Sequence, residues 1–356
     1  MKQRYEWVDA AKGLSIILVV MMYSAYNVGK YTGDVGILHY VIGFATPFRM
    51  PEFFLISGLF LSNVISREWA SYTDRRVVHY FYFYFVWTAI NVILKTAAEY
   101  GGVGDILQGL ALAVVEPYGV LWFIYMLGVF SVAAKLARQF KVPHALIIAL
   151  AAALQMTGFQ SVSYVVTQFC AYFFFFYLGY VAAPLVFRIV GYAEEHPRLA
   201  GGGLVLWAAL EYFFVFWPGG TPHPMDMEMG VASFPPLHLA LGVLGAIALC
   251  VLGRLLMLSA SMAWLRWLGE HSLVVYVAFV LPMSAARIIA LRSGIVTGTS
   301  ALSIIVLAAS LAAPVVLYLL IKRVGIGEFL FERPSWAHIP GTLRSRSVPR
   351  LASAAE

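Results

Sequence analysis

Residues 12–29, KGLSIILVVMMYSAYNVG, are the first of a series of apolar runs that decide the fold. A helix needs about 20 mostly apolar residues to cross a bilayer, and runs of nearly that length recur along the chain. The sequence therefore predicts an all-α, polytopic transmembrane helical bundle with about ten spanning helices. The shorter stretch 35–48 is expected to be re-entrant or tilted, and 103–115 to form an interfacial helix. The expected spans are 12–29, 51–66, 77–96, 119–138, 142–158, 165–188, 199–217, 236–257, 271–291 and 299–321.

The composition supports a membrane protein and argues against other classes. Of 356 residues, 61% are hydrophobic and 12% are charged, whereas soluble domains carry roughly 25% charged residues. The net charge of +6 is attributed to basic loops, so no nucleic-acid partner is expected. Cys170 and Cys250 each lie in an apolar run, which predicts neither a disulfide framework nor a zinc site. Because no nucleotide fingerprint or metal-ligand spacing is found, no bound cofactor or metal is expected.

The charges between the apolar runs predict the orientation. Basic residues follow the even-numbered spans, whereas the alternate loops carry acidic residues and few cations, with Arg49, Arg287 and Arg292 as exceptions. The positive-inside rule then places both termini in the cytoplasm. The basic residues after the even-numbered spans are Arg67, Arg75, Arg76, Lys135, Arg138, Lys141, Arg188, Arg198, Arg254, Arg266, Lys322 and Arg323.

The domain organisation is expected to be simple. Residues 1–334 are interpreted as one membrane domain, and residues 335–356 as a basic tail that is expected to be disordered. The first apolar run has no signal-cleavage pattern after it, which predicts a retained helix. The aromatic run 172–177 is expected to face lipid. The oligomeric state is left open.

Ionisable residues near the first run are the first candidates for function, because charge inside a span is costly. Asp9 and Lys12 are three residues apart, so they share a helical face and can form an ion pair. Tyr23 follows Lys12 by eleven residues, which places it on nearly the same face about 16 Å deeper. Two interpretations remain: an interfacial ion pair with a snorkelling lysine, or a cationic grip at the cytoplasmic mouth of a cavity.

The stretch 48–58, FRMPEFFLISG, is a second candidate site. Pro51 suits a first helical turn, so Arg49 and Glu52 are expected at a helix start on the outer side. Ser57 and Gly58 give a small face for close helix approach. Because an ordinary membrane helix has no need for Arg-x-x-Glu, we expect Arg49, Glu52 and Ser57 to line a site.

Further candidates are spread along the chain. Trp122 and Tyr125 share a face near the outer interface, where belt anchoring would also explain them. Glu211 lies among apolar neighbours and is expected either to pair with a cation or to be protonated. Tyr276 follows the polar group at 269–272.

Five motifs in this order resemble the acyltransferase-3 family of bacterial membrane O-acyltransferases. The resemblance covers nearly the whole chain and is greatest to a branch of inner-membrane proteins that share Arg-Met-Pro-x-Phe-Phe-Leu, here residues 49–55. The motifs are Asp9-Ala-Ala-Lys12-Gly13 with the apolar run to Tyr23, Phe53-Phe-Leu-Ile-Ser-Gly58, Arg75-Arg76, Leu121-Trp-Phe-Ile124, and Gly269-Glu-His-Ser272 with Tyr276.

The resemblance implies a multi-pass enzyme of the bacterial cytoplasmic membrane. Such proteins are taken to move an acyl group from a cytoplasmic donor, often acetyl-CoA, to a hydroxyl of an envelope glycan, lipid or similar acceptor. Lys12 would stand at the family's donor-side arginine, and Tyr23 at its catalytic histidine. Arg75 or Arg76 would help to grip the donor phosphates.

The tyrosine at position 23 departs from the family pattern. Histidine can accept a hydroxyl proton at neutral pH, whereas a phenol keeps its own proton. The chain therefore uses another base, uses Tyr23 as a hydrogen-bond donor, or is catalytically inactive, and His39 is a possible substitute base. The leading interpretation is an O-acyltransferase-like protein. A non-catalytic binding, sensing or transport relative and an unrelated secondary transporter remain as alternatives.

Overall fold

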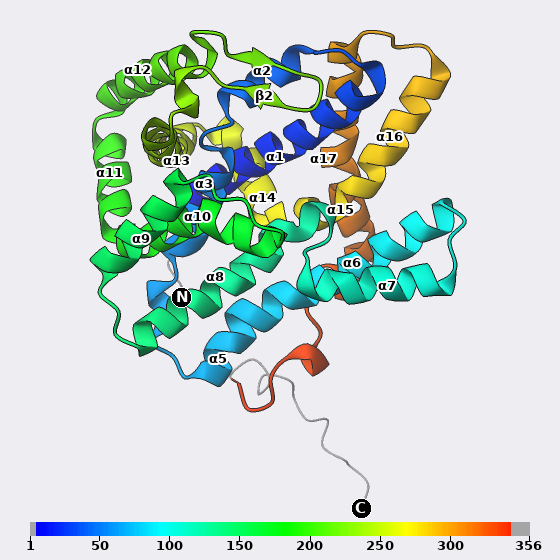
Figure 1. The fold of residues 1–356 in the computed structure, drawn as a ribbon, viewed down its shortest axis with the longest axis horizontal. Helices are drawn as coiled ribbons and strands as arrows, with labels where there is room; N and C mark the ends of the chain where they lie inside the picture. Colours follow the sequence, from blue (N-terminus) through cyan, green and yellow to red (C-terminus); the bar gives the residue numbers. More distant parts are fainter. Residues whose placement is uncertain (1–4, 343–356) are drawn as a thin grey trace, which may run out of the picture. The chain divides into compact units, whose positions relative to one another are not determined.

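The computed structural model describes residues 5–342. The chain divides into two compact units. Unit 1 comprises Met1–Phe60, Pro143–Ser161 and Val166–Leu317, and unit 2 comprises Leu61–Val142, Val162–Val165 and Tyr318–Glu356. Figure 1 gives the order of the elements along the chain.

The described part of the chain is almost entirely helical. A two-stranded antiparallel hairpin of β1 (Thr221–Pro222) and β2 (Met227–Glu228) interrupts the helices. Short 3₁₀ turns join several of them, and a π-helical turn, η1 (Asp74–Val78), joins α5 to α6. The α-helices are α1 (Glu6–Thr32), α2 (Ile37–Phe44), α3 (Arg49–Leu59), α4 (Ser62–Ile65), α5 (Trp69–Thr73), α6 (His79–Ala98), α7 (Val103–Val115), α8 (Trp122–Gln139), α9 (His144–Met156), α10 (Tyr164–Val181), α11 (Ala183–Glu195), α12 (Pro197–Phe216), α13 (Pro235–Leu256), α14 (Ala263–Glu270), α15 (Ser272–Ala278), α16 (Val280–Ser293) and α17 (Thr299–Val324).

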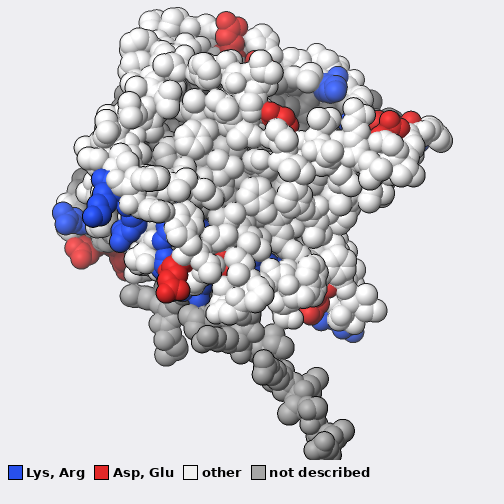
Figure 2. Space-filling view, turned by 60° about the horizontal axis from the view of Figure 1, so that its bottom comes forward, with Lys and Arg blue, Asp and Glu red and all other residues white. Residues whose placement is uncertain are grey.

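The number of spans differs from the ten expected. Among the described residues, seven helical segments are long and apolar enough to cross a membrane, or eight if α15 and α16, bent by 56°, form one broken span. The expected span 51–66 is divided, because α3 ends at Leu59 and α4 has only four residues. The expected span 142–158 becomes α9, whose 13 residues measure about 20 Å and fall short of a hydrocarbon core of about 30 Å. Most of the surface in Figure 2 carries neither acidic nor basic residues, in keeping with a lipid environment.

In unit 1, α1 packs against α14, α13 and α3. Two glycines allow the α1–α14 crossing: a Cβ at Gly269 would lie 1.6 Å from the carbonyl oxygen of Asp9, and one at Gly13 would lie 2.4 Å from that of Leu265. Larger residues at these positions would push the helices apart. The glycines of the first and last motifs therefore meet in one helix contact.

The aromatic run of α10 is buried, which contradicts the expectation that it faces lipid. Phe175, Phe176 and Tyr177 are at most 1% exposed. The reason is the close approach of α10 to α3, where Gly58 and Gly179 let each helix backbone meet the other. This contact places Tyr172 of α10 near the start of α3.

In unit 2, tyrosine hydroxyls hold the C-terminal end of α7. The hydroxyl of Tyr84 in α6 donates to the carbonyl of Ala113 at 2.6 Å, and that of Tyr125 in α8 donates to the carbonyl of Val114 at 3.0 Å. These bonds satisfy carbonyls that a helix end leaves without intrahelical partners. The helix expected at 103–115 is confirmed as α7.

Candidate functional site

The start of α1 carries the predicted ion pair. Lys12 Nζ lies 3.6 Å from Asp9 Oδ1, which confirms that the two side chains share a face. Asp9 is 6% exposed, whereas the lysine side chain is one-third exposed. The cation therefore reaches outward while the carboxylate stays buried.

Glu52 lies slightly deeper in unit 1, against α1. Its side chain is fully buried and hydrogen-bonds with the hydroxyl of Ser15, which also lies 2.8 Å from the carbonyl oxygen of Ala11. Lys12 acts electrostatically on Glu52, but no ion pair to Glu52 is found among the described residues. Glu52 is thus a carboxyl group in the helix bundle with a hydroxyl as its neighbour.

Arg49, three residues before Glu52, contacts a different set of groups. It is 8% exposed, and its Nη1 lies 3.5 Å from the carbonyl oxygen of Ile42. The phenols of Tyr23, Tyr26 and Tyr172 interact with it electrostatically. Within residues 5–342, Arg49 has no acidic group at ion-pair distance, and its Nε has no hydrogen-bond partner. We call Arg49 with these three tyrosines the Arg49 cluster.

The Arg49 cluster and Glu52 occupy two levels along α1. Ser15 and Tyr23 are eight residues apart on α1, which corresponds to about 12 Å along the helix axis. Since Glu52 contacts Ser15 and Arg49 lies near Tyr23, α3 runs antiparallel to α1. Arg49 and Glu52, which were expected to line one site, therefore occupy two neighbouring polar positions.

Tyr23 faces the interior of unit 1. Its ring centre lies 5.5 Å from that of Phe279, which is fully buried where α15 meets α16. Tyr276 is 3% exposed and its ring lies 6.5 Å from the same phenylalanine. Tyr23 and Tyr276, from the first and last motifs, thus flank one aromatic residue.

Two other candidates of unit 1 lie in apolar surroundings. Glu211 is fully buried, and Trp207, one turn earlier, approaches it. In the described part of the chain, neither the Glu211 carboxyl nor the Trp207 indole makes a hydrogen bond of normal geometry. The Ser57 hydroxyl donates to the carbonyl of Phe53 in its own helix at 2.8 Å. An apolar groove of about 450 Å³ between α11, α12 and α13 includes Trp207 but neither Glu211 nor Tyr23.

His39 is not placed to act as a substitute base. Its side chain is 1% exposed, its Nδ1 accepts the backbone N–H of Gly36 at 3.0 Å, and its Nε2 lies 3.3 Å from the carbonyl oxygen of Pro224. An Nδ1 that accepts a backbone proton has no lone pair left for a substrate. Burial lowers the pKa of His39 and favours this neutral form.

The remaining candidates belong to unit 2. Arg75 and Arg76 lie in the π-helical turn η1, and Arg76 Nη1 donates to the Tyr80 hydroxyl at 3.3 Å. Trp122 is 7% exposed and its ring lies 6.1 Å from that of Tyr164. Tyr125 is buried, and its hydroxyl is used at the end of α7.

Comparison with known proteins decides the family. The sequence profile of a family described as "Acyltransferase domain" matches residues 5–319. The chain belongs to the acyltransferase-3 family. It is also 29% identical over 170 residues to the inner membrane protein YcfT of Escherichia coli (strain K12), a match that covers 40% of this chain and 46% of that relative. The chain thus matches less than half the length of this curated relative, and no solved structure matches it.

Family membership and the membrane helices together describe a multi-pass membrane protein of the acyltransferase-3 family, with an inner membrane protein as a relative. Sequence reasoning missed three contributors to its polar positions. Tyr26 could have been found, because it lies three residues after Tyr23 on the same face of α1. Tyr172 was hidden in a run of aromatic residues, and Ser15 looked like an ordinary small residue. Within residues 5–342, no group of three or more His, Cys, Asp or Glu could hold a metal ion.

Proposed function

We propose that this acyltransferase-3 protein transfers an acetyl or similar short acyl group from a cytoplasmic acyl-CoA to a hydroxyl group of an envelope glycan or lipid. The protein would act in the cytoplasmic membrane of a bacterium, with both termini in the cytoplasm. Family membership supports the reaction class. The Arg49 cluster supports assigning this reaction to specific residues, because it joins a buried cation to Tyr23, which the resemblance aligns with the family's histidine.

The chemistry needs a group that stabilises negative charge. The acceptor oxygen attacks the thioester carbonyl carbon, so that a C–O bond forms and negative charge develops on the carbonyl oxygen. Breaking the C–S bond then releases the thiolate of coenzyme A. The hydroxyl proton of the acceptor ends on that thiolate, so the overall reaction consumes no proton. Among the described residues the buried Arg49 guanidinium has no acidic group at ion-pair distance, which suits the oxyanion, since a low-dielectric site strengthens such stabilisation.

Each candidate residue takes a role in this scheme. Arg49 would stabilise the oxyanion, and Tyr23 would orient the acceptor or carbonyl oxygen through its hydroxyl. Arg75 and Arg76, in unit 2, are the proposed ligands of the donor phosphates. Lys12 with Asp9, in unit 1, is a separate candidate for the donor side. The other expected site residues of unit 1, Glu52, Ser57, Glu211 and Tyr276, would line or support the acceptor side. Trp122 and Tyr125, in unit 2, are separate candidates for contact with the acceptor.

A catalytically inactive relative is the second candidate function. Position 23 is a tyrosine, and a phenol that keeps its proton is a poor base at neutral pH. Such a protein would bind, sense or transport a ligand on the same scaffold.

Acyl transfer from radiolabelled acetyl-CoA to envelope material separates the two functions. The test variants would be Tyr23→Phe, Tyr23→His and Arg49→Gln. Membranes with these variants and with the wild-type protein would be compared with Tyr212→Phe, which removes an exposed phenol from the same unit. The proposal expects label with the wild-type protein and Tyr212→Phe, and a loss of about a hundredfold or more in Tyr23→Phe and Arg49→Gln, as when an oxyanion donor is removed. Label that appears only in Tyr23→His would identify an inactive relative.

A further inference from the structure

The segment at residues 328–342, here called the C-terminal strap, is bound to α6 of unit 2. The hydroxyl of Tyr82 donates to the carbonyl of Phe329 and the indole of Trp87 donates to the carbonyl of Leu330, both at 2.9 Å. The ring of Trp336 lies 6.1 Å from that of Tyr82. The boundary expected after Pro334 falls inside this strap, and residues 343–356 of the expected tail lie outside the described residues.

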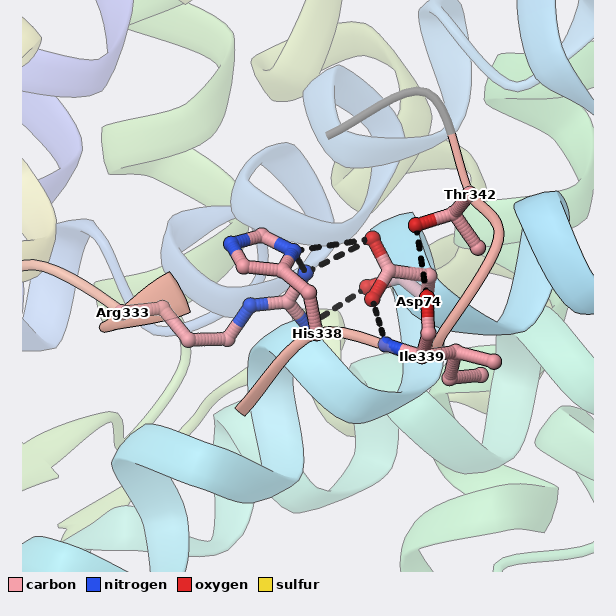
Figure 3. Close-up of polar contacts among 5 residues, drawn as sticks. All are labelled: Asp74, Arg333, His338, Ile339 and Thr342. Carbon is pink, nitrogen blue, oxygen red and sulfur yellow. Dashed lines mark hydrogen bonds and ion pairs between the residues drawn. The ribbon is translucent and has the colours of Figure 1, made fainter. Parts of the chain in front are cut away.

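Before α6, in the turn η1, the C-terminal strap surrounds the side chain of Asp74 (Figure 3). Arg333 Nη2 donates to Asp74 Oδ2 at 2.8 Å, and the backbone N–H of Ile339 donates to Oδ1 at 2.9 Å. His338 Nδ1 lies 3.1 Å from Oδ2 and also contacts Arg333. Asp74 is 1% exposed, and the side chain of Arg333 is 2% exposed. The ion pair between them is therefore shielded from water.

Asp74 is also the first residue of the π-helical turn η1. Its backbone carbonyl accepts a second bond from the same arginine, with Arg333 Nη1 at 2.7 Å. Single π-helical turns are rare and occur frequently at functional sites. Both the side chain and the backbone of Asp74 are thus fixed at the point where the helix departs from α-helical geometry.

This turn contains Arg75 and Arg76. Reversion of a π-helical turn to an α-helix changes the register by one residue, which turns the flanking side chains by about 100° relative to each other. The hydrogen bond from Arg76 to the Tyr80 hydroxyl belongs to the present register. The directions of the two guanidinium groups therefore depend on whatever holds η1 in place.

We infer that the C-terminal strap is a positioning element for Arg75 and Arg76, and that it sets the affinity of the protein for the phosphate groups of its acyl donor. This inference rests on the proposed function in one respect, the assignment of these arginines to the donor. Arg333 and Asp74 act through the two arginines and do not touch the reacting atoms.

The experiment uses the full chain in lipid nanodiscs. Arg333→Gln removes the cation of the buried pair, and the double variant Asp74→Asn/Arg333→Gln removes both charges, so that no unpaired charge is left inside. Glu332→Gln is the matched control. It changes a residue of the C-terminal strap and breaks its exposed ion pair with Lys322 of α17, but it does not affect the contacts of Asp74. KM and kcat are measured with acetyl-CoA and with its 3′-dephospho analogue.

The KM for acetyl-CoA is expected to rise about tenfold in both strap variants, the change that corresponds to one lost hydrogen bond to a charged group. The kcat of both strap variants should stay unchanged, and so should the KM of the Glu332→Gln control. In the strap variants, the preference for the 3′-phosphorylated donor should shrink. A double variant with the wild-type KM, or an equal loss of kcat with both donors, would overturn the inference.

Binding of adenosine 3′,5′-bisphosphate separates this inference from the proposed function. If the wild-type protein transfers no acyl group but binds this probe, and both strap variants bind it less tightly, the positioning role stands without acyl transfer. If the wild-type protein does not bind the probe, the positioning role is overturned.

Discussion

The close contact between α3 and α10 predicts how much stability the protein loses when one methyl group is added at Gly58. A Cβ at Gly58 would lie 2.1 Å from the carbonyl oxygen of Phe176, and one at Gly179 would lie 2.1 Å from that of Leu55. Ordinary contact at such positions begins at 3.4 Å. Gly58→Ala therefore forces the two backbones apart by roughly an ångström, and overpacking of this kind costs about 1–3 kcal/mol.

Thermal unfolding of the purified protein in nanodiscs measures this cost. Gly58→Ala is expected to lower the midpoint by several degrees, because about 1 kcal/mol moves the midpoint of a large domain by 2–4 °C. Gly202→Ala is the control, since a Cβ there meets nothing within 4 Å. Alanine favours a helix over glycine by up to about 1 kcal/mol, so the control should unfold at or above the wild-type temperature.

The double variant Gly58→Ala/Gly179→Ala tests the mechanism. Once α3 and α10 have separated to admit one methyl group, the second needs little further movement. The double variant should therefore lose less stability than the sum of the losses in the two single variants, as expected for positions that share one contact. A Gly58→Ala protein that unfolds no earlier than Gly202→Ala would refute the close approach.

Three further predictions concern other buried groups. Because the pKa of His39 is lowered in the fold, its neutral form stabilises the protein, fully above the usual pKa of 6.5 and less as the pH falls through the lower folded pKa. Between pH 7 and 5, the unfolding midpoint of the wild-type protein should therefore drop more than that of His39→Gln. Lys135 Nζ donates to the carbonyls of Ile65 and Arg67 at 2.7 and 2.6 Å, so Lys135→Met should cost about 2–4 kcal/mol in chemical denaturation, whereas the exposed Arg138→Gln on the same helix should cost almost nothing. Glu52→Gln should leave the unfolding midpoint near that of the wild type, because an amide can still hydrogen-bond with the Ser15 hydroxyl; acyl-transfer assays on this variant then report whether the carboxyl group is needed in the reaction.

The local parts of the site could be predicted from the sequence. The Asp9–Lys12 pair follows from a spacing of three residues on one helix, and its ion pair is confirmed. The helix at 103–115 follows from an apolar run with turn residues on both sides. Such features depend on neighbours along the chain, so periodicity is sufficient to find them.

Features that depend on how helices pack could not be predicted in the same way. Arg49 and Glu52 are neighbours on α3, yet one lies among tyrosines and the other against Ser15. The hydrophobic run of α10 has no periodicity that separates a lipid-facing helix from a buried one, and its burial follows from its contact with α3. The bonds of Asp74 to the C-terminal strap join residues about 260 positions apart.

The two levels along α1 limit how the acceptor hydroxyl can lose its proton. A tyrosine phenol of ordinary pKa is a poor base at neutral pH, and a guanidinium cannot accept a proton. In the proposed reaction the Arg49 cluster would therefore stabilise charge but would offer no base. Glu52 lies at the level of Ser15, about 12 Å along α1 from Tyr23, which is too far for a direct transfer. If Glu52→Gln keeps its fold but abolishes transfer, the acceptor hydroxyl reacts at the Glu52 level and Tyr23 supports the reaction from a distance. If Tyr23→Phe abolishes transfer and Glu52→Gln does not, the reaction is centred on Arg49, and the leaving thiolate itself must receive the proton from the acceptor.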